Sequence, residues 1–306
     1  MFAPPPLIET EIFASVPAEL RRKGYQSEWT HIMRHGAPTD CFLEGPSFDR
    51  NGNLFVVDIP FGRILKIDPD RKFSVVAEYD GEPCGLKFDK ADRAYITDFK
   101  NGLMSLDVRT GEVKPYLERR LLERFKGVND LVFADNGDLY FTDQGQSGLH
   151  DPTGRLFRLR ANGGLDLLLD KVPSPNGLVL NLEQTAIYLA VTRGNCIWRV
   201  PLLENNETPK TGLFIQLSGS LAGPDGLAID EAGNLAITHP GLGVVWLFSR
   251  LGEPIARIQS RTGLATTNVA YGWPDRNWLY ITESDTGNIL RTRLPTPGRL
   301  MYSHQS

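Results

Sequence analysis

Six segments of this 306-residue chain share one pattern, and that pattern limits what the chain can fold into. Each segment has a short apolar strand, a polar turn containing Gly, Asn or Asp, and a second strand whose apolar residues alternate. A turn of this kind between two runs of period two is typical of a β-hairpin. The six segments are residues 43–58, 83–98, 128–143, 175–191, 224–239 and 267–283.

The hairpins recur at a nearly constant spacing along the chain. A third strand follows each hairpin and a fourth follows most of them, as residues 62–68 and 73–79 follow the first. Equivalent positions are separated by 40, 45, 47, 49 and 43 residues. Such a period, with four strands per unit, predicts an all-β fold, a six-bladed β-propeller. Packed β-sandwiches or an irregular stack of sheets are the alternatives.

The sixth repeat ends near Leu294 with only three strands. Residues 8–16, IETEIFASV, resemble the outer strands of the other repeats, so we expect this N-terminal strand to close the last blade and hide its edge. Residues 1–306 then form a single domain. The stretch 17–42 fits no blade, and it is either a lid across one face or a linker.

Composition narrows the classes of partner. The chain has 33 Lys and Arg against 37 Asp and Glu, a net charge of −4, so no basic stripe suggests a nucleic-acid partner. No apolar run approaches the length of a membrane span, and the N-terminus lacks the pattern of a signal peptide. The three cysteines form no CxxC pair. We expect a cytoplasmic protein with a small-molecule substrate, and leave a homo-oligomer open.

One position of the repeat, at the start of each hairpin, is occupied mostly by polar residues that could bind a ligand. In a propeller it starts the innermost strand, so its side chains converge on the central channel, and five of the six carry oxygen acceptors. Buried carboxylates need partners, and two carboxylates with amide oxygens suit one divalent cation, Ca²⁺ first, with Mg²⁺, Mn²⁺ or Zn²⁺ as alternatives. A water-filled polar channel, with a structural ion or none, is the competing interpretation. The residues at this position are Glu44, Cys84, Asn129, Asn176, Asp225 and Asn268.

The motifs around this position resemble a known family. LEGPSFD (43–49), VNDLVFADNGDLYFTD (128–143), SPNGL (174–178) and GPDGLAID (223–230) resemble the gluconolactonase/senescence-marker-protein (regucalcin-like) family of six-bladed propeller lactonases. The resemblance implies that Glu44, Asn176 and Asp225 hold a catalytic divalent metal. It also implies that Asn129 lies near the metal and contacts the substrate or a metal-bound water.

The resemblance implies a metal-dependent hydrolase that opens a lactone ring, with Asp225 as the candidate catalytic residue. Asp225 could be the base, the nucleophile or a metal ligand only. Alternatives are an organophosphate or other ester hydrolase, and a non-catalytic ligand-binding propeller with a structural Ca²⁺. Members that act on sugar lactones often have an arginine where this chain has Gly127, which favours a less polar lactone or ester.

Three further polar residues are candidates for contacts with substrate: Asn268, at the ring position, and Asp143 and His239, each at the end of the second strand of a hairpin. Residues at these strand ends could instead close turns. An imidazole near the metal could shuttle protons, whereas the competing interpretation of His239 is a hydrogen-bonded loop histidine.

Overall fold

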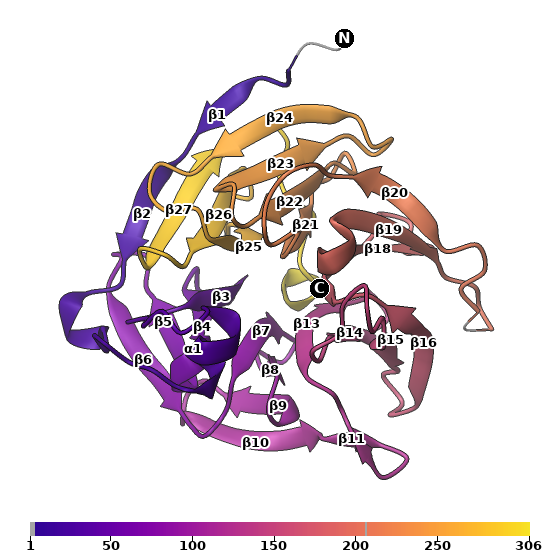
Figure 1. Cartoon of the computed structure of the whole chain (residues 1–306), viewed down its shortest axis with the longest axis horizontal. Helices are drawn as coiled ribbons and strands as arrows, with labels where there is room; N and C mark the ends of the chain where they lie inside the picture. Colours follow the sequence, from indigo (N-terminus) through magenta and orange to yellow (C-terminus); the bar gives the residue numbers. More distant parts are fainter. Residues whose placement is uncertain (1–3, 206) are drawn as a thin grey trace.

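The computed structural model describes residues 4–205 and 207–306. Over these residues the main sheets stand around a common axis, as the blades of a six-bladed β-propeller (Figure 1). Successive strands within each blade pair antiparallel, from the innermost strand outward. The prediction of an all-β, six-bladed propeller with four strands per blade is confirmed.

Residues 43–172 form blades 1 to 3, with the connections between them. Blade 1 contains β3 (Leu43–Phe48), β4 (Leu54–Asp58), β5 (Arg63–Ile67) and β6 (Phe73–Glu78). Blade 2 contains β7 (Pro83–Phe88), β8 (Ala94–Asp98), β9 (Gly102–Asp107) and β10 (Glu112–Leu117). A ribbon of β11 (Arg119–Arg120) and β12 (Glu123–Arg124) precedes blade 3. Blade 3 contains β13 (Val128–Phe133), β14 (Leu139–Asp143), β15 (Gly154–Leu159) and β16 (Leu165–Val172).

Residues 175–293 form blades 4 to 6, apart from the strands that the N-terminal segment adds. Blade 4 contains β17 (Pro175–Leu180), β18 (Ala186–Val191), β19 (Cys196–Pro201) and β20 (Gly212–Gln216). Blade 5 contains β21 (Leu227–Ile229), β22 (Leu235–His239), β23 (Val244–Phe248) and β24 (Pro254–Gln259). Blade 6 contains β25 (Thr266–Tyr271), β26 (Trp278–Glu283) and β27 (Asn288–Arg293).

The N-terminal segment closes the ring, as predicted, but over fewer residues. Strand β2 (Glu11–Ser15) pairs antiparallel with β27 and completes blade 6. Strand β1 (Leu7–Glu9) instead pairs parallel with β24 of blade 5. Thr10 lies between them, and both its amide and its hydroxyl donate to the carbonyl of Gln259. Residues 8 and 9 therefore extend blade 5, which corrects the predicted boundary of the closing strand.

The hydrophobic core lies between neighbouring blades. Alternate residues of each strand face the adjacent sheet, and one cluster joins blades 1 and 2 through the fully buried Ile64, Leu86 and Ile96. Each such side chain stabilises the fold by about 1.5–3 kcal/mol through the apolar surface it removes from water. Because every blade packs on two neighbours, the inner strands have fixed positions around the channel.

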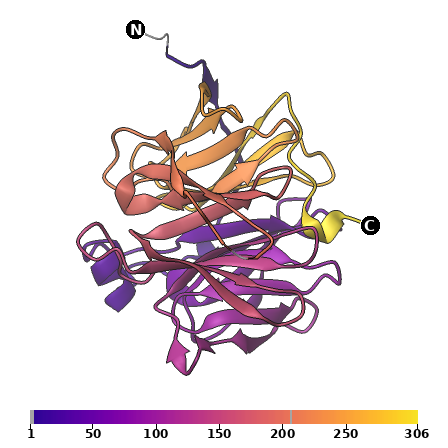
Figure 2. The same cartoon turned by 90° about the vertical axis from the view of Figure 1, so that its right-hand side faces the viewer.

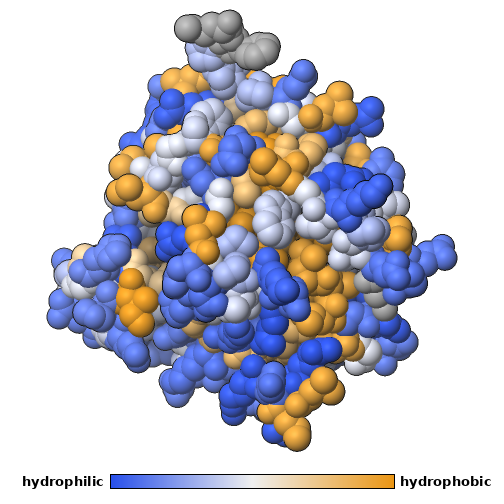
Figure 3. All heavy atoms as spheres, turned by 45° about the vertical axis from the view of Figure 1, so that its right-hand side comes forward, coloured by the Kyte–Doolittle hydropathy of each residue, from blue (hydrophilic) through white to orange (hydrophobic). Residues whose placement is uncertain are grey.

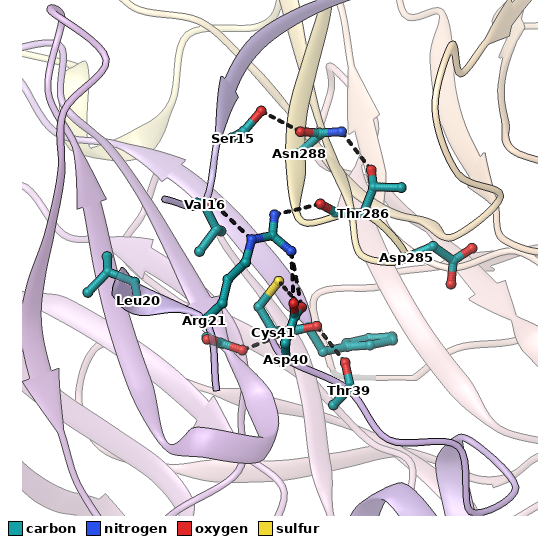
Figure 4. Close-up of polar contacts among 12 residues, drawn as sticks. Ser15, Val16, Leu20, Arg21, Thr39, Asp40, Cys41, Asp285, Thr286 and Asn288 are labelled. Atoms are coloured by element: carbon teal, nitrogen blue, oxygen red, sulfur yellow. Dashed lines mark hydrogen bonds and ion pairs between the residues drawn. The ribbon is translucent and has the colours of Figure 1, made fainter. Parts of the chain in front are cut away.

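The stretch 17–42 leaves the ring and lies over one face. It contains a short 3-10 turn and helix α1 (Glu28–Met33), which begins at a capping box made by Ser27 and Thr30. Arg21 ties the start of the stretch to its end and to blade 6 (Figure 4). Its guanidinium pairs with Asp40 at 3.1 Å and donates to the carbonyl of Thr286 at 2.7 Å.

The C-terminal residues lie on the opposite face from α1 (Figure 2). Arg299 donates its amide to the carbonyl of Ile229, and the guanidinium of Arg50 donates to the carbonyl of Ser303 at 2.7 Å. On the face that Figure 3 shows, hydrophilic residues surround several patches of hydrophobic residues. In the described part of the chain, no helix is long and apolar enough to cross a membrane.

Candidate active site

The face under α1 opens into a cavity of about 990 Å³. Four of the residues predicted at the ring position line it together: Glu44, Asn129, Asn176 and Asp225. Cys84 lines it as well. The structure therefore brings the predicted metal-ligand set and Asn129 to one site, at the inner end of four different blades.

Bulges in the inner strands aim Glu44, Asn129 and Asn176 at the channel, whereas Asp225 precedes β21, which pairs with β22 without a register shift. The pairing of the first two strands shifts register in five blades, between Glu44 and Ser47 in blade 1 and at the equivalent place in the others. A bulge bends the strand and redirects its side chains, and bulges are common beside active sites. The other four shifts lie at 83–85, 128–131, 175–178 and 266–268.

Glycines after the ring position let neighbouring inner strands approach. A Cβ on Gly177 would lie 2.3 Å from the carbonyl oxygen of Asp225, and one on Gly45 would lie 2.9 Å from the Cα of Gly85. Only glycine fits such backbone contacts without a shift. The close approach brings the ring residues of adjacent blades to the same point.

A series of threonines holds the backbone of the ring. Each lies on or just after the second strand of one blade and donates its hydroxyl to a carbonyl at the start of the next. Thr97 donates to Asn129 at 2.5 Å, and Thr142 donates to Asn176 at 3.0 Å. Because the threonines are part of the blades, they fix the positions of the ring residues before any ligand binds. The series continues with Thr192 to Pro224 and Thr238 to Thr267, both at 2.8 Å.

Asp130 is a site residue that the sequence analysis missed. It directly follows the ring position, at a place where four of the other five blades have a glycine, and it is 4% exposed. The amide of Asn268 donates to its Oδ2 at 3.3 Å and to Oε2 of Glu44 at 2.8 Å. Glu44, Asp130 and Asp225 thus form one acid cluster. The replacement of glycine by an acid in the ND motif was the signal that could have identified it.

Burial and mutual repulsion shift the acids of this cluster. The pKa of Glu44 lies well above its usual range, because burial removes water from the carboxylate and because Asp225 and Asp130 are nearby. Burial and the charge of Asp130 also raise the pKa of Asp225, against a hydrogen bond from Asn176 and the charge of Arg193. Without a cation, the cluster would hold protons that a cation would displace.

The acid cluster differs from other buried acids of the same face. Asp58 pairs with Arg63, and Asp143 pairs with Arg155, whose Nε donates to Oδ2 at 2.7 Å. Within the described residues, none of the three carboxylates of the acid cluster forms an ion pair. An unpaired buried charge is costly, so the cluster is the place where a cation would be stabilised.

The donor set fits a hard divalent cation. Glu44 and Asp225 offer carboxylate oxygens and Asn176 an amide oxygen, which are ligands that Ca²⁺ accepts. In residues 4–205 and 207–306, no group of three or more His, Cys, Asp or Glu side chains is arranged to hold a metal. The predicted ligand set is of another kind, because it combines only two carboxylates, those of Glu44 and Asp225, with the amide oxygen of Asn176.

The two asparagines predicted to contact substrate lie differently. Asn129 is half-buried in the cavity wall, where its Nδ2 donates to Oε1 of Gln144 at 3.0 Å. Asn268 is 2% exposed and does not line the cavity. Its amide joins Glu44 to Asp130, so Asn268 positions the acids rather than facing a ligand.

Asp143 and His239 lie outside the cavity lining, and both are fully buried. Asp143 accepts from the amide of Gly127 at 2.8 Å besides its pairing with arginine. His239 accepts from Nε1 of Trp246 at 3.1 Å and lies 3.0 Å from Oδ1 of Asn195. These positions do not support the expectation that either residue contacts substrate, and both side chains secure loops on this face.

The sequence of this chain matches one protein family and several named enzymes. Residues 42–285 match the family model described as SMP-30/Gluconolactonase/LRE-like region. A gluconolactonase of Zymomonas mobilis subsp. mobilis is 29% identical over 287 residues, covering 83% of this chain and 79% of its own. Lactonase drp35 of Staphylococcus aureus strain MW2 is 27% identical over 294 residues, covering 91% and 88%.

A solved structure supports the fold over nearly the whole chain. The calcium-binding protein regucalcin from Agrobacterium tumefaciens superimposes with a TM-score of 0.77 at 21% identity. The alignment covers 98% of this chain and 99% of that one.

Proposed function

Because the chain belongs to the SMP-30/gluconolactonase family, we propose that it is a metal-dependent hydrolase that opens a lactone ring. One observation carries the proposal: Glu44 and Asp225 of the acid cluster line the inner end of a large cavity. Glu44 and Asp130 are buried, Asp225 is partly buried, and in the described residues none of the three forms an ion pair. The names of the relatives, gluconolactonase and lactonase, support the substrate class.

In the proposed reaction, water attacks the carbonyl carbon and the ring C–O bond breaks. The proton passes to the ring oxygen, which leaves as the hydroxyl group of a hydroxy acid. Asp225 holds the water and accepts its proton, as a general base within reach of the carbonyl carbon. Asn129 and Asn176 present amide groups that orient the substrate and Asp225.

Glu44, Asn176 and Asp225 would hold the cation, with Ca²⁺ as the first candidate. A divalent cation at this place would polarise the carbonyl and stabilise the negative charge on its oxygen. Asn268 donates a hydrogen bond of 2.8 Å to Glu44, so the carboxylate keeps its position while the substrate reacts.

A panel of lactones, aryl esters and organophosphates, assayed with a pH indicator, tests the reaction class. We expect hydrolysis of at least one lactone, loss of that activity with a chelator, and its return on adding Ca²⁺, Mg²⁺, Mn²⁺ or Zn²⁺. Hydrolysis of only the phosphate or aryl esters would change the class. An inactive protein that still binds Ca²⁺ would favour the non-catalytic alternative.

Two variants separate the base from the ligand. Asp225→Asn keeps an oxygen donor but cannot accept a proton, so we expect kcat on the best lactone to fall at least about 100-fold at saturating metal. Glu44→Gln loses charge only, and added metal should restore much of its turnover. Near-normal kcat of Asp225→Asn at full metal occupancy would show that Asp225 is only a ligand.

A further inference from the structure

The cavity is larger than an unsubstituted lactone needs. Its volume of about 990 Å³ lies near the top of the range that holds drug-sized ligands. The acid cluster occupies only its inner end. Whatever reacts at the cluster therefore has room to extend toward the mouth, and the side chains there select what can extend.

The wall beneath α1 is apolar. Trp29 and Phe42 pack edge to face with ring centroids 4.9 Å apart, and both line the cavity. They belong to a core cluster that also holds Ile59, Phe99 and Cys84, so this wall continues from the mouth to the ring position. Its inner part is rigid because it is the surface of the packed core.

Gly127 gives Phe99 its place in this wall. A Cβ at position 127 would lie 2.6 Å from the ring of Phe99. The absence of a side chain on Gly127 therefore allows the aromatic ring to line the cavity. A long polar side chain at position 127 would displace that ring, so the glycine favours an apolar surface over a polar one.

Two apolar side chains of α1 remain exposed at the mouth. Ile32 is 45% exposed and Met33 is 48% exposed, although both line the cavity. The helix is held in place by its capping box and by the ion pair of Arg34 with Asp285 at 3.1 Å. A fixed helix that exposes apolar surface inside a concave site gains free energy when a ligand covers that surface.

The next two blades provide a polar wall. Nε2 of Gln144 donates to the hydroxyl of Ser174 at 2.9 Å, and Arg193 lines the same part of the cavity. Apolar side chains of the lining are concentrated beneath α1 and on blades 1 and 2, although Glu28, Arg34 and Glu82 also line the cavity there. The lining of blades 3 and 4 is more polar, with the exposed Leu149 as an exception. A ligand that suits both has a polar reacting group and an apolar extension.

We propose that Ile32, Met33 and Phe99 bind an alkyl or aryl substituent of the lactone, so that the enzyme prefers apolar substituted lactones to polyhydroxylated ones. This rests on the proposed lactone hydrolysis. The lactone carbonyl lies at the acid cluster, and the substituent lies along the apolar wall beneath α1.

The test is a series of γ-lactones with hydrogen, ethyl, butyl and hexyl substituents, with D-glucono-δ-lactone for comparison. A fully buried methylene is worth about fourfold in affinity, so about twofold per methylene in kcat/KM is expected at this half-open wall. The double variant Ile32→Gln/Met33→Gln should reduce that dependence to less than about 1.3-fold. Both side chains are exposed, and a melting curve checks the fold.

Two matched controls isolate the effect. Ile32→Leu/Met33→Leu keeps the apolar surface and should keep the dependence on chain length. Leu251→Gln changes a leucine that is 75% exposed outside the cavity, and it should also keep it. A flat series in the wild type, faster turnover of the gluconolactone, or an unchanged dependence in the glutamine variant would overturn the proposal.

A binding measurement separates this proposal from the proposed reaction. Calorimetry compares 2-pyrrolidinone with its 5-hexyl derivative, two lactams that resist hydrolysis. Tighter binding of the hexyl lactam to the wild type, and not to the glutamine variant, supports the apolar wall even if every lactone resists turnover. Equal binding of the two lactams contradicts it, even if unsubstituted lactones are hydrolysed.

Discussion

The two ends of the central channel are built from the same six inner strands but carry different chemistry. The end beneath α1 is open and contains the acid cluster. At the other end, residues 299–303 help to enclose a small cavity of about 120 Å³, lined by apolar side chains such as Phe133 and Ile229. Tyr302 stacks on Phe133 with ring centroids 5.0 Å apart.

The difference follows from the position of the bulges, which in five of the six blades lie at the acidic end of the inner strand. At the acidic end the bulges and glycines turn polar side chains into the channel. At the other end the strands are regular, so apolar residues face inward and the C-terminal segment covers them. One end is therefore suited to chemistry, and the other contributes stability. The predictions below test this division.

Deleting residues 298–306 should have the largest effect. It uncovers Phe133 and Ile229 and removes the half-buried Met301 and Tyr302, which we expect to cost about 4 kcal/mol. For a chain of this size the melting temperature should fall by about 8 °C. Lactone turnover at 20 °C should change less than threefold, because the acid cluster is untouched.

A shorter deletion is the control for that experiment. Removing only residues 305–306 loses two exposed contacts, Gln305 with Asp135 and Lys90 with the carbonyl of Ser306, and should leave the melting curve unchanged. Loss of turnover by the longer deletion, while the protein remains folded, would mean that the two ends are coupled.

Cation binding should stabilise the acidic end by a smaller amount. At a free Ca²⁺ concentration 100 times the Kd, linkage gives about 2.7 kcal/mol of stabilisation, or about 5 °C in melting temperature. The double variant Glu44→Ala/Asp225→Ala should show no such shift in calorimetry or melting. An equal Ca²⁺ shift in that variant would place the cation elsewhere, whereas the deletion of residues 298–306 should retain the shift.

The smallest effect concerns His239, one layer outside the acid cluster. Burial lowers the pKa of His239 to about 4. In the unfolded chain the imidazole has a pKa of about 6.5, so it binds a proton at a higher pH than in the folded chain. The free energy of unfolding therefore decreases as pH falls from about 6.5 toward 4. Between pH 7 and pH 5 the loss should be about 1–2 kcal/mol, measured by urea unfolding.

The variant His239→Asn provides the comparison for that slope. It removes the titration and can still accept from Trp246, so the difference between the two proteins isolates this residue from the acids. The raised pKa values of Glu44 and Asp225 act in the opposite direction in metal-free protein. Identical pH dependence of wild type and variant would contradict the assignment.

The repeat made most of the fold predictable. Hairpin turns and period-two alternation are local, so the blades, their number and the ring position could be read from one chain. The same logic placed Glu44, Asn129, Asn176 and Asp225 at one cavity. The parallel pairing of β1 was not predictable, because three residues can extend either of two neighbouring blades.

The rest of the site depended on irregular backbone and on partners across strands. Asp130 follows Asn129 directly, and alternation would send its side chain away from the channel, but the bulge between Val128 and Leu131 breaks the alternation. For Asp143 the deciding partner is Arg155 on the next strand, and for His239 it is Trp246. Such pairings depend on strand register, which the pattern of residue types left open.

The closure of the ring by β2 has a consequence for how the protein is made. Residues 11–15 are synthesised more than 270 residues before their partner β27, which begins at Asn288. Contacts so distant in sequence form late, since the intervening chain must first be ordered. Until β2 and β27 pair, each presents an unpaired edge to other strands, so the nascent chain depends on fast completion of its last blade to avoid aggregation.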